Sequence, residues 1–209
     1  MERFTGYIAG FGTTGGRRLV VGHWTESPLG AFTDVMTEDR AGNRTLLAPN
    51  RAVADYVWAT YRFDDVVVSP LTAALTGDLV LRVCGGPLDL TVHLGAVTAL
   101  GRAMERIPAR LAVHPAWLAA INPLARALVP GVATAGSAGG GRREFYGVRS
   151  IRGIDRVSAG WGGADLGALA PVDPPVRFGF SSVPRTPQAV AITTTVLPPR
   201  RGAAAEGPP

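Results

Sequence analysis

Two alternating runs of apolar and polar side chains flank a Gly-Gly-Pro segment in residues 77–95, and this pattern restricts the fold most. Alternation with a period of two places successive side chains on opposite faces of a strand, and the short glycine–proline segment predicts a β-hairpin. One face of this hairpin is entirely apolar and consists of Leu79, Leu81, Val83, Leu88, Leu90, Val92 and Leu94. A sheet with such a face has to bury it, so we expect the chain to fold around a β-sheet core.

The opposite face of the hairpin, over residues 78–94, is mostly polar and leaves two alternatives open. If it lines a cavity, Arg82 can pair with a substrate carboxylate and His93 can move a proton near neutral pH. If it faces solvent, the same side chains form an ordinary polar surface, which is the commoner arrangement in an antiparallel sheet.

The remaining sequence predicts many short strands, because apolar runs are separated by segments rich in glycine and proline, which number 27 and 17 among the 209 residues. We expect strands at residues 4–11, 17–24, 31–38, 43–49, 64–70, 144–151, 154–159, 176–180 and 189–196. This spacing indicates a mostly β chain of the α+β class: an antiparallel β-barrel or strongly bent sheet of about ten short strands with a few flanking helices.

Two segments predict helices. Asn50 is a good N-cap for a helix over residues 51–62, in which apolar side chains recur every four residues. Residues 101–130 are rich in alanine and leucine, but four prolines divide them into short helical pieces. Because no linker interrupts the chain, we predict one domain over residues 1–197 and a disordered tail over residues 198–209.

The basic side chains exclude several classes of enzyme, because all 21 are arginine and the chain has no lysine. A P-loop nucleotide-binding site, a protein kinase and a pyridoxal enzyme each require a lysine. One cysteine and three histidines also exclude a structural zinc site, an intrachain disulfide and a Cys-x-x-Cys redox centre. We therefore expect no metal and no cofactor.

The arginines are scattered along the chain, and no basic patch alternates with aromatic residues as nucleic-acid binders require. We therefore expect no nucleic acid as a partner, despite the formal net charge of +5. No apolar run of about 20 residues lacks charges, and no basic-then-apolar leader opens the chain, so we expect neither a membrane span nor a signal peptide. A cytoplasmic location follows by default.

Residues 10–15 match the G-x-G-x-x-G pattern of dinucleotide-binding turns. That pattern binds a pyrophosphate only where a helix begins at its last glycine. Residues 17–21 have strand character instead, so we expect a glycine-rich hairpin loop at this place.

Two stretches resemble the acetoacetate decarboxylase-like barrel proteins: SPLGAFTDVM at residues 27–36 and GRREFYGVRSIR at residues 141–152. The resemblance implies a barrel scaffold, with Asp34 at the family's carboxylate position and Phe32 two residues before it. It also implies a catalytic lysine pair, which forms an imine with a keto acid, but the matching segment contains arginine and no lysine. A guanidinium group stays protonated and cannot form an imine, so decarboxylation through an imine is excluded.

These observations predict a small-molecule enzyme that uses an apolar barrel cavity without covalent catalysis. Asp34, His93 and Tyr146 are the candidate catalytic proton donors or acceptors. The candidate substrate-binding residues are Trp24, Phe32, Arg82, Arg149 and Trp161.

The expected reaction is cyclisation, isomerisation or elimination of an apolar, polyketide-like or keto-acid metabolite. The substrate would be a small apolar molecule with a carboxylate or carbonyl group. A binding or carrier barrel without catalysis is the alternative, and homo-oligomerisation is left open.

Overall fold

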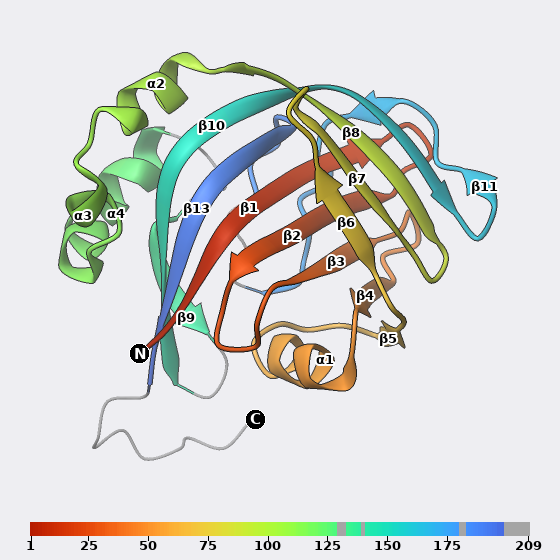
Figure 1. The fold of residues 1–209 in the computed structure, drawn as a ribbon, viewed down its shortest axis with the longest axis horizontal. Coiled ribbons are helices and arrows are strands. Elements are labelled where there is room, and N and C mark those ends of the chain that lie inside the picture. Colours follow the sequence, from red (N-terminus) through yellow and green to blue (C-terminus); the bar gives the residue numbers. More distant parts are fainter. Residues whose placement is uncertain (129–132, 139–140, 180–182, 199–209) are drawn as a thin grey trace.

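A single curled β-sheet forms the centre of the computed structural model, which describes residues 1–128, 133–138, 141–179 and 183–198 (Figure 1). Its ten main strands are β1 (Glu2–Thr13), β2 (Arg18–Glu26), β3 (Phe32–Glu38), β4 (Arg44–Ala48), β5 (Asp65–Val68), β6 (Thr72–Leu75), β7 (Val80–Gly85), β8 (Leu88–Val97), β10 (Arg142–Trp161) and β13 (Gln188–Leu197). Three short strands pair with β10 or β1, namely β9 (Ala135–Ala138), β11 (Ala164–Asp165) and β12 (Leu169–Ala170). The described helices are α1 (Arg51–Trp58), α2 (Ala99–Glu105), α3 (Ala109–Ala112) and α4 (Pro115–Leu128).

The main strands follow one another in the order β5-β4-β3-β2-β1-β13-β10-β8-β7-β6, so β5 and β6 are the edges of an open sheet. The sheet curls into a half-barrel, and its described neighbours are antiparallel except for the parallel pair β4–β5 (Figure 1). The predicted α+β, mostly β fold is therefore confirmed, as a strongly bent sheet with flanking helices. The first and last of its strands, β1 and β13, lie side by side.

The glycine-rich segment of residues 10–15 belongs to a β-hairpin, as predicted. Gly10 and Gly12 lie within β1, and the turn closes where the Thr13 N–H donates to the Arg17 carbonyl at 2.9 Å. The strand β2 then begins where a dinucleotide-binding turn would need a helix, so the pattern does not form a phosphate site here.

The predicted hairpin of residues 77–95 is formed by β7 and β8. Val83 and Leu90 are fully buried inside the curl, where they pack with apolar side chains of β1, β2 and β10. Leu79 departs from the predicted apolar face, because its backbone lies in the left-handed region (φ 63°) just before β7 begins. These buried side chains form an apolar core inside the curl, which we call the first core. It contains most of the predicted apolar face.

The polar face of the same hairpin points outward. Arg82, Cys84 and Asp89 are exposed, and His93 is half-buried beside the exposed Arg156. Of the two alternatives left open by the sequence, the structure shows the polar surface and not the lining of a cavity.

The segment predicted as two strands, residues 144–151 and 154–159, is the single strand β10 of 20 residues. Register shifts occur between Val148 and Ser150 and again before Arg156, so the strand absorbs extra residues as β-bulges and bends without ending. The strand predicted at residues 176–180 is also wrong: residues 176–179 are irregular, and residue 180 lies outside the described part of the chain.

The helices differ from the prediction in their limits. Asn50 caps α1 as expected, because its Oδ1 accepts from the Val53 N–H at 3.0 Å, but the helix ends at Trp58. Pro123 does not divide the second helical region and lies inside α4. Its missing N–H would have bonded to the carbonyl of Ala119, an exposed residue at which water can replace the lost donor.

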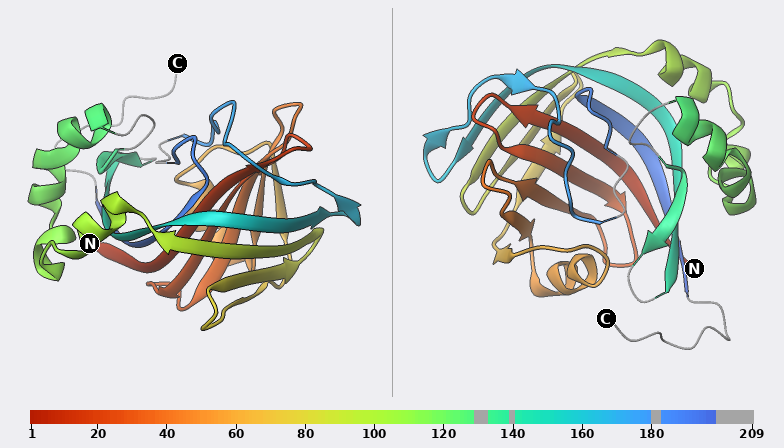
Figure 2. Two further views of the ribbon diagram at one scale, coloured as in Figure 1. Left: turned by 90° about the horizontal axis from the view of Figure 1, so that it is seen from above. Right: turned by 180° about the vertical axis from the view of Figure 1, so that it is seen from behind.

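The helices flank the sheet in two places. In both views of Figure 2, α2, α3 and α4 gather on one side of the sheet beside the first half of β10, which they contact. Helix α1 contacts β4 and β5 and lies near one end of β3 (Figure 1). None of the helices in the described ranges is long and apolar enough to cross a membrane. The predicted disordered tail lies, apart from Pro198, outside the described residues.

Candidate functional site

A cavity of about 580 Å³ lies on the face of the sheet that points away from the first core. Along β1, Phe4 and Ile8 face this cavity, whereas Ala9 and Phe11 face the first core. Its size falls in the usual range for small-molecule sites, which is about 300–1,000 Å³. The strands β1, β2, β3, β13 and β10 provide its floor.

Helices form the walls of the cavity. Helix α1 contributes Tyr56, the residues after it contribute Tyr61, α2 contributes Met104, and α4 contributes Trp117 and Ile121. The lining is mainly apolar and aromatic, so the few polar groups that reach it are the candidates for chemistry.

Asp34 is the first of these polar groups. It lies in the middle of β3, is 4% exposed and lines the cavity beside Phe32 and Met36. Its Oδ1 accepts a hydrogen bond from Trp24 Nε1 at 3.0 Å. Burial raises the pKa of Asp34 to about 7, and the bond from Trp24 lowers it only in part. The carboxyl group is therefore poised to hold or release a proton near neutral pH.

Gly22 makes room for the hydrogen bond between Trp24 and Asp34. It lies opposite Asp34 on the neighbouring strand β2, and it also lines the cavity. A Cβ atom at this position would lie 2.6 Å from Asp34 Oδ1 and 2.7 Å from Trp24 Nε1. The hydrogen bond between the two side chains thus requires the absence of a side chain at residue 22.

The turn before β3 brings Asp34 to this place. In this turn, the Gly30 N–H donates to the Ser27 carbonyl at 3.1 Å, and the Leu29 N–H donates to Ser27 Oγ at 3.0 Å. Gly30 has a φ of 81°, which favours glycine. The turn lets β3 pair with β2, and this pairing sets Asp34 opposite Gly22.

Glu144 is the second carboxyl group that lines the cavity. It lies near the start of β10, and the Tyr61 hydroxyl from the residues after α1 donates to its Oε1 at 3.2 Å. Tyr61 and Tyr146 also share a hydrogen bond of 2.9 Å between their hydroxyl oxygens. Burial raises the pKa of Glu144 to about 7, although the hydrogen bonds from both tyrosines and the charge of Arg142 lower it.

The tyrosines of this cluster stay protonated. Burial and the adjacent Glu144 carboxylate raise the pKa values of Tyr61 and Tyr146 well above the ordinary value. Their hydroxyl groups therefore act as hydrogen-bond donors to Glu144. The cluster also links the residues after α1 to β10 across one side of the cavity.

Arg142 is the cation whose charge acts on Glu144, and the residues after α1 hold it in place. Its Nη2 donates to the Ala59 carbonyl at 3.1 Å and to Thr60 Oγ1 at 2.9 Å, and its guanidinium group lies 5.4 Å from the centre of the Tyr56 ring. Among the described residues, no arginine or histidine lines the cavity. The ionisable groups of its lining are acids and tyrosines only.

Four of the residues predicted for the site come together in this cavity. Trp24, Phe32, Asp34 and Tyr146 all line it, although they come from β2, β3 and β10. The aromatic rings of Trp24 and Phe32 lie 6.4 Å apart between centroids.

The other four predicted residues lie elsewhere. Arg82 and Arg149 are exposed, and His93 Nε2 lies 3.1 Å from Arg156 Nη2 at the surface. Trp161 packs against the first core, with the Arg17 guanidinium group 4.2 Å from its ring centre. The physical reason is strand alternation: these side chains belong to the surface or to the opposite face of the sheet, so they cannot bind a substrate in this cavity.

Sequence reasoning missed Glu144 and Tyr61. Glu144 shares a strand face with Tyr146, which is two residues further along, and this spacing was a signal that could have identified it. Tyr61 had no such signal, because its contact with Glu144 joins residues 83 positions apart.

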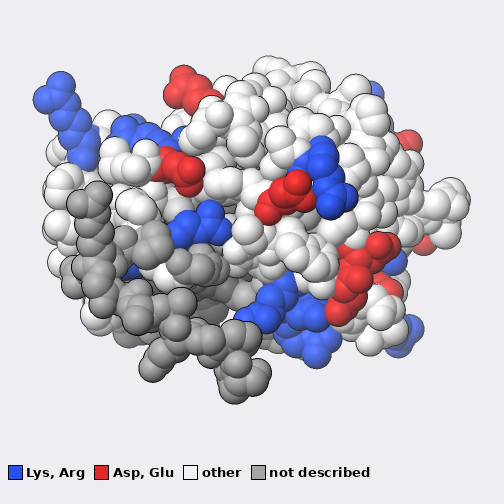
Figure 3. Space-filling model, turned by 90° about the horizontal axis from the view of Figure 1, so that it is seen from below, with Lys and Arg blue, Asp and Glu red and all other residues white. Residues whose placement is uncertain are grey.

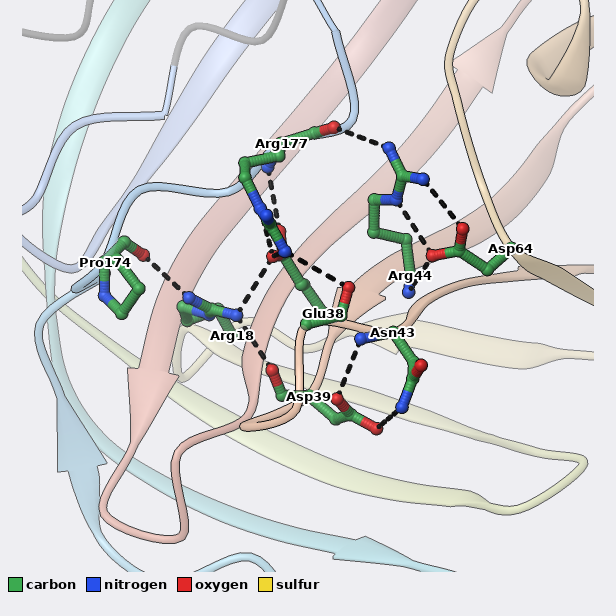
Figure 4. Close-up of polar contacts among 9 residues, drawn as sticks. Arg18, Glu38, Asp39, Asn43, Arg44, Asp64, Pro174 and Arg177 are labelled. Atoms are coloured by element: carbon green, nitrogen blue, oxygen red, sulfur yellow. Dashed lines mark hydrogen bonds and ion pairs between the residues drawn. The ribbon is translucent and has the colours of Figure 1, made fainter.

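A separate polar cluster lies at the far ends of β2 and β3 (Figure 4). Glu38 is 1% exposed and accepts from the Arg177 backbone N–H at 2.8 Å, while its Oε1 lies 2.7 Å from Arg177 Nη2 and 3.3 Å from Arg18 Nη2. Arg18 also donates to the carbonyls of Asp39 and Pro174. These contacts attach residues 174–177 to the sheet, and they leave Glu38 fully paired.

Acidic and basic side chains are interspersed on the surface. On the face shown in Figure 3, acidic side chains lie beside arginines. Among the described residues, no group of three histidine, cysteine, aspartate or glutamate side chains is placed to hold a metal ion.

Comparison of the chain with models of protein families, with curated proteins and with solved structures finds no match. The resemblance to the decarboxylase-like barrels therefore stays a prediction, and the function has to be argued from the cavity itself.

Proposed function

We propose that this protein is an enzyme that binds a small apolar molecule in the cavity and moves protons on it, in an isomerisation, a cyclisation or an elimination. The observation that carries the proposal is the placement of two buried carboxyl groups, Asp34 and Glu144, in the lining of one apolar cavity. A concave apolar pocket with a few convergent ionisable groups is the usual form of an active site.

The protonation states of the two carboxyl groups suit acid–base catalysis. Burial brings the pKa values of Asp34 and Glu144 each to about 7, so both the acid and the base form are populated near neutral pH. A general acid or base works best when its pKa lies near the working pH, and it contributes about 10²–10⁴-fold to the rate.

The two groups address different parts of a bound molecule. Asp34 lies on β3 and Glu144 on β10, which are four strands apart in the order of the sheet. At about 4.8 Å per strand this separation is roughly 19 Å along the curled sheet. Asp34 would therefore act at one end of the substrate, and Glu144 with its two tyrosines at the other.

A binding or carrier protein without catalysis is the second candidate. It is favoured by the hydrogen bonds that Tyr61 and Tyr146 make to Glu144, because the bond from Tyr61 also serves as a structural link between the residues after α1 and β10. Under this alternative Asp34 would be the carboxyl group that contacts the ligand.

Exchange of carbon-bound protons tests the proposal directly. The protein is incubated in D₂O with a panel of aryl ketones, with and without an amino group, and deuterium incorporation beside the carbonyl is followed by NMR. We expect exchange by the wild type and a loss of about 100-fold in Asp34→Asn or Glu144→Gln.

Tyr7→Phe is the control, because Tyr7 lies on the surface outside the cavity lining. Binding of the panel without exchange or turnover, at any pH between about 6 and 8, would refute catalysis and support the carrier alternative.

A further inference from the structure

We infer that the Asp34 end of the cavity is a seat for a protonated amine, so that the ligand is an apolar amine and not a carboxylic acid. The inference rests on the proposed function only in that the cavity binds a small molecule. It goes further in naming the charge of that molecule and the residue that recognises it.

The lining of the cavity contains acidic and neutral ionisable groups but no cation among the described residues. Its ionisable side chains among the described residues are Asp34 on β3, Glu144 and Tyr146 on β10, and Tyr56 and Tyr61 beside or within α1. All five are neutral or negative, so none can form an ion pair with an anion. A carboxylate ligand would therefore lose its hydration without gaining a cationic partner, which is strongly unfavourable in an apolar cavity.

Asp34 differs from the other buried acids in how few partners it has. Glu38 contacts two arginines, and Glu144 accepts from two tyrosines near Arg142. Within the described part of the chain, the Asp34 carboxyl group has one side-chain donor, Trp24 Nε1, and one backbone donor, its own N–H. An ionised carboxylate has about four acceptor sites, so its remaining sites are available to a ligand in the cavity that it lines.

Aromatic side chains line the cavity together with this carboxyl group. Phe4, Trp24 and Phe32 line the cavity with Asp34, with ring centroids 5.7 Å apart for Phe4 and Trp24 and 6.4 Å apart for Phe4 and Phe32. The faces of aromatic rings attract a cation, and the attraction grows when the cation is desolvated. A carboxylate among aromatic rings thus favours an ammonium group with an apolar body.

The other carboxyl group is a weaker seat for a cation. Glu144 is held by Tyr61 and Tyr146, and the Arg142 charge already acts on it. An ammonium ion there would displace these hydrogen bonds and meet a like charge. No charged side chain of the described residues acts on Asp34 in this way, so the amine should bind at its end.

A matched set of ligands tests this inference by calorimetry. Naphthylethylamine, naphthylethanol and naphthylacetic acid share one apolar body and differ in the charge of the polar group. At about pH 8 we expect the amine to bind the full-length protein at least tenfold more tightly than the alcohol, and the acid to bind most weakly. Equal or tighter binding of the alcohol or the acid overturns the inference, as does the failure of all three to bind.

The pH dependence of binding to the wild type provides a second readout. The amine requires ionised Asp34, so its affinity should rise between about pH 6 and pH 8 as this group loses its proton. A ligand carbonyl or alcohol that accepts a hydrogen bond from protonated Asp34 would show the opposite trend. If amine affinity falls or stays constant over this range, Asp34 is not the seat of a cation.

Two variants locate the seat. Asp34→Asn keeps the shape of the side chain and should abolish the preference for the amine, while the alcohol binds as before. Glu144→Gln is the matched control and should retain the preference. A preference that survives in Asp34→Asn but disappears in Glu144→Gln overturns the assignment to Asp34. Because these are binding measurements, they can fail while proton exchange succeeds, and the reverse also holds.

Discussion

Trp24 Nε1 donates a hydrogen bond of 3.0 Å to Asp34 Oδ1 across the open position of Gly22. The three residues lie on neighbouring strands, and all of them line the cavity. This contact orients the carboxyl group that both the proposed chemistry and the proposed amine seat use. It also requires a glycine at residue 22, because a larger side chain there would disrupt the contact.

Replacing that glycine should break the contact. In Gly22→Ala the new Cβ would lie within 3 Å of both polar atoms, so one of the two side chains has to turn away. We expect a loss of about 1–2 kcal/mol in unfolding free energy, because a buried hydrogen bond is lost, together with a shift of the Trp24 indole N–H resonance. Gly153→Ala is the control, since a Cβ there meets no atom within 4 Å. An unchanged indole resonance in Gly22→Ala would contradict the structure.

The raised pKa of Asp34 predicts how stability depends on pH. Its pKa is 3.8 in the unfolded reference and about 7 in the fold, so between these values the folded protein holds a proton that the unfolded chain has released. The stabilisation is complete below pH 3.8 and is lost as the pH rises through about 7. Asp34→Asn removes this dependence and should be more stable than the wild type above neutral pH, by at most about 4 kcal/mol.

Urea unfolding at a series of pH values measures this effect. Glu144 contributes a dependence of the same sign, so the slope in Asp34→Asn should decrease and not vanish. Asp55→Asn serves as the control, because this side chain is 64% exposed. A slope in Asp34→Asn equal to that of the wild type would show that Asp34 titrates normally.

Loss of a tyrosine hydroxyl should move the pKa of Glu144 further upward. The hydrogen bond from Tyr61 favours the ionised carboxylate, so Tyr61→Phe should raise the pKa of Glu144 above about 7 and cost about 1–2 kcal/mol of stability. NMR titration of the side-chain carboxyl carbons checks the first effect, and Tyr7→Phe is the comparison. A lower pKa of Glu144 in the variant would contradict this role of Tyr61.

The buried ion pairs at the other end of the sheet carry a separate prediction. Glu38→Ala leaves the Arg18 guanidinium group, 4% exposed, without its carboxylate, and should cost about 3–5 kcal/mol. Asp55→Ala breaks the exposed pair with Arg51 and should cost less than about 0.5 kcal/mol. Thermal or urea unfolding measures both losses. Similar losses in the two variants would show that the Glu38 contacts contribute no more than a surface pair.

Features that depend on neighbours in the sequence were predicted well. Alternation over residues 77–95 identified the β7–β8 hairpin and most of its buried face, and Asn50 identified the start of α1. The hairpin between β1 and β2 followed from strand character after the glycines. The long strand β10 was missed, because β-bulges let a strand continue through residues that read locally as a break.

The site was predicted only in part for the same reason. Asp34 and Phe32 are two residues apart and therefore share one face of β3, and the structure sets that face against the cavity. His93 and Arg82 satisfied the same spacing rule on β8 and β7, yet their face points to solvent. Spacing reveals which side chains share a face of a strand, but whether that face meets solvent depends on what packs against it.

The sequence by itself determined the alternation of the strands, the turns between them, the absence of lysine chemistry and the pairing of side chains on common faces, because these properties arise from residues close together in the chain. Only the tertiary structure decided that Asp34 and Glu144 line one cavity, that Tyr61 reaches Glu144 across 83 residues, and that no described cation shares the lining. These properties come from contacts between segments that are distant in the chain. The same contacts bury Asp34 and Glu144 away from water, and this burial brings the pKa values of both carboxyl groups to about 7.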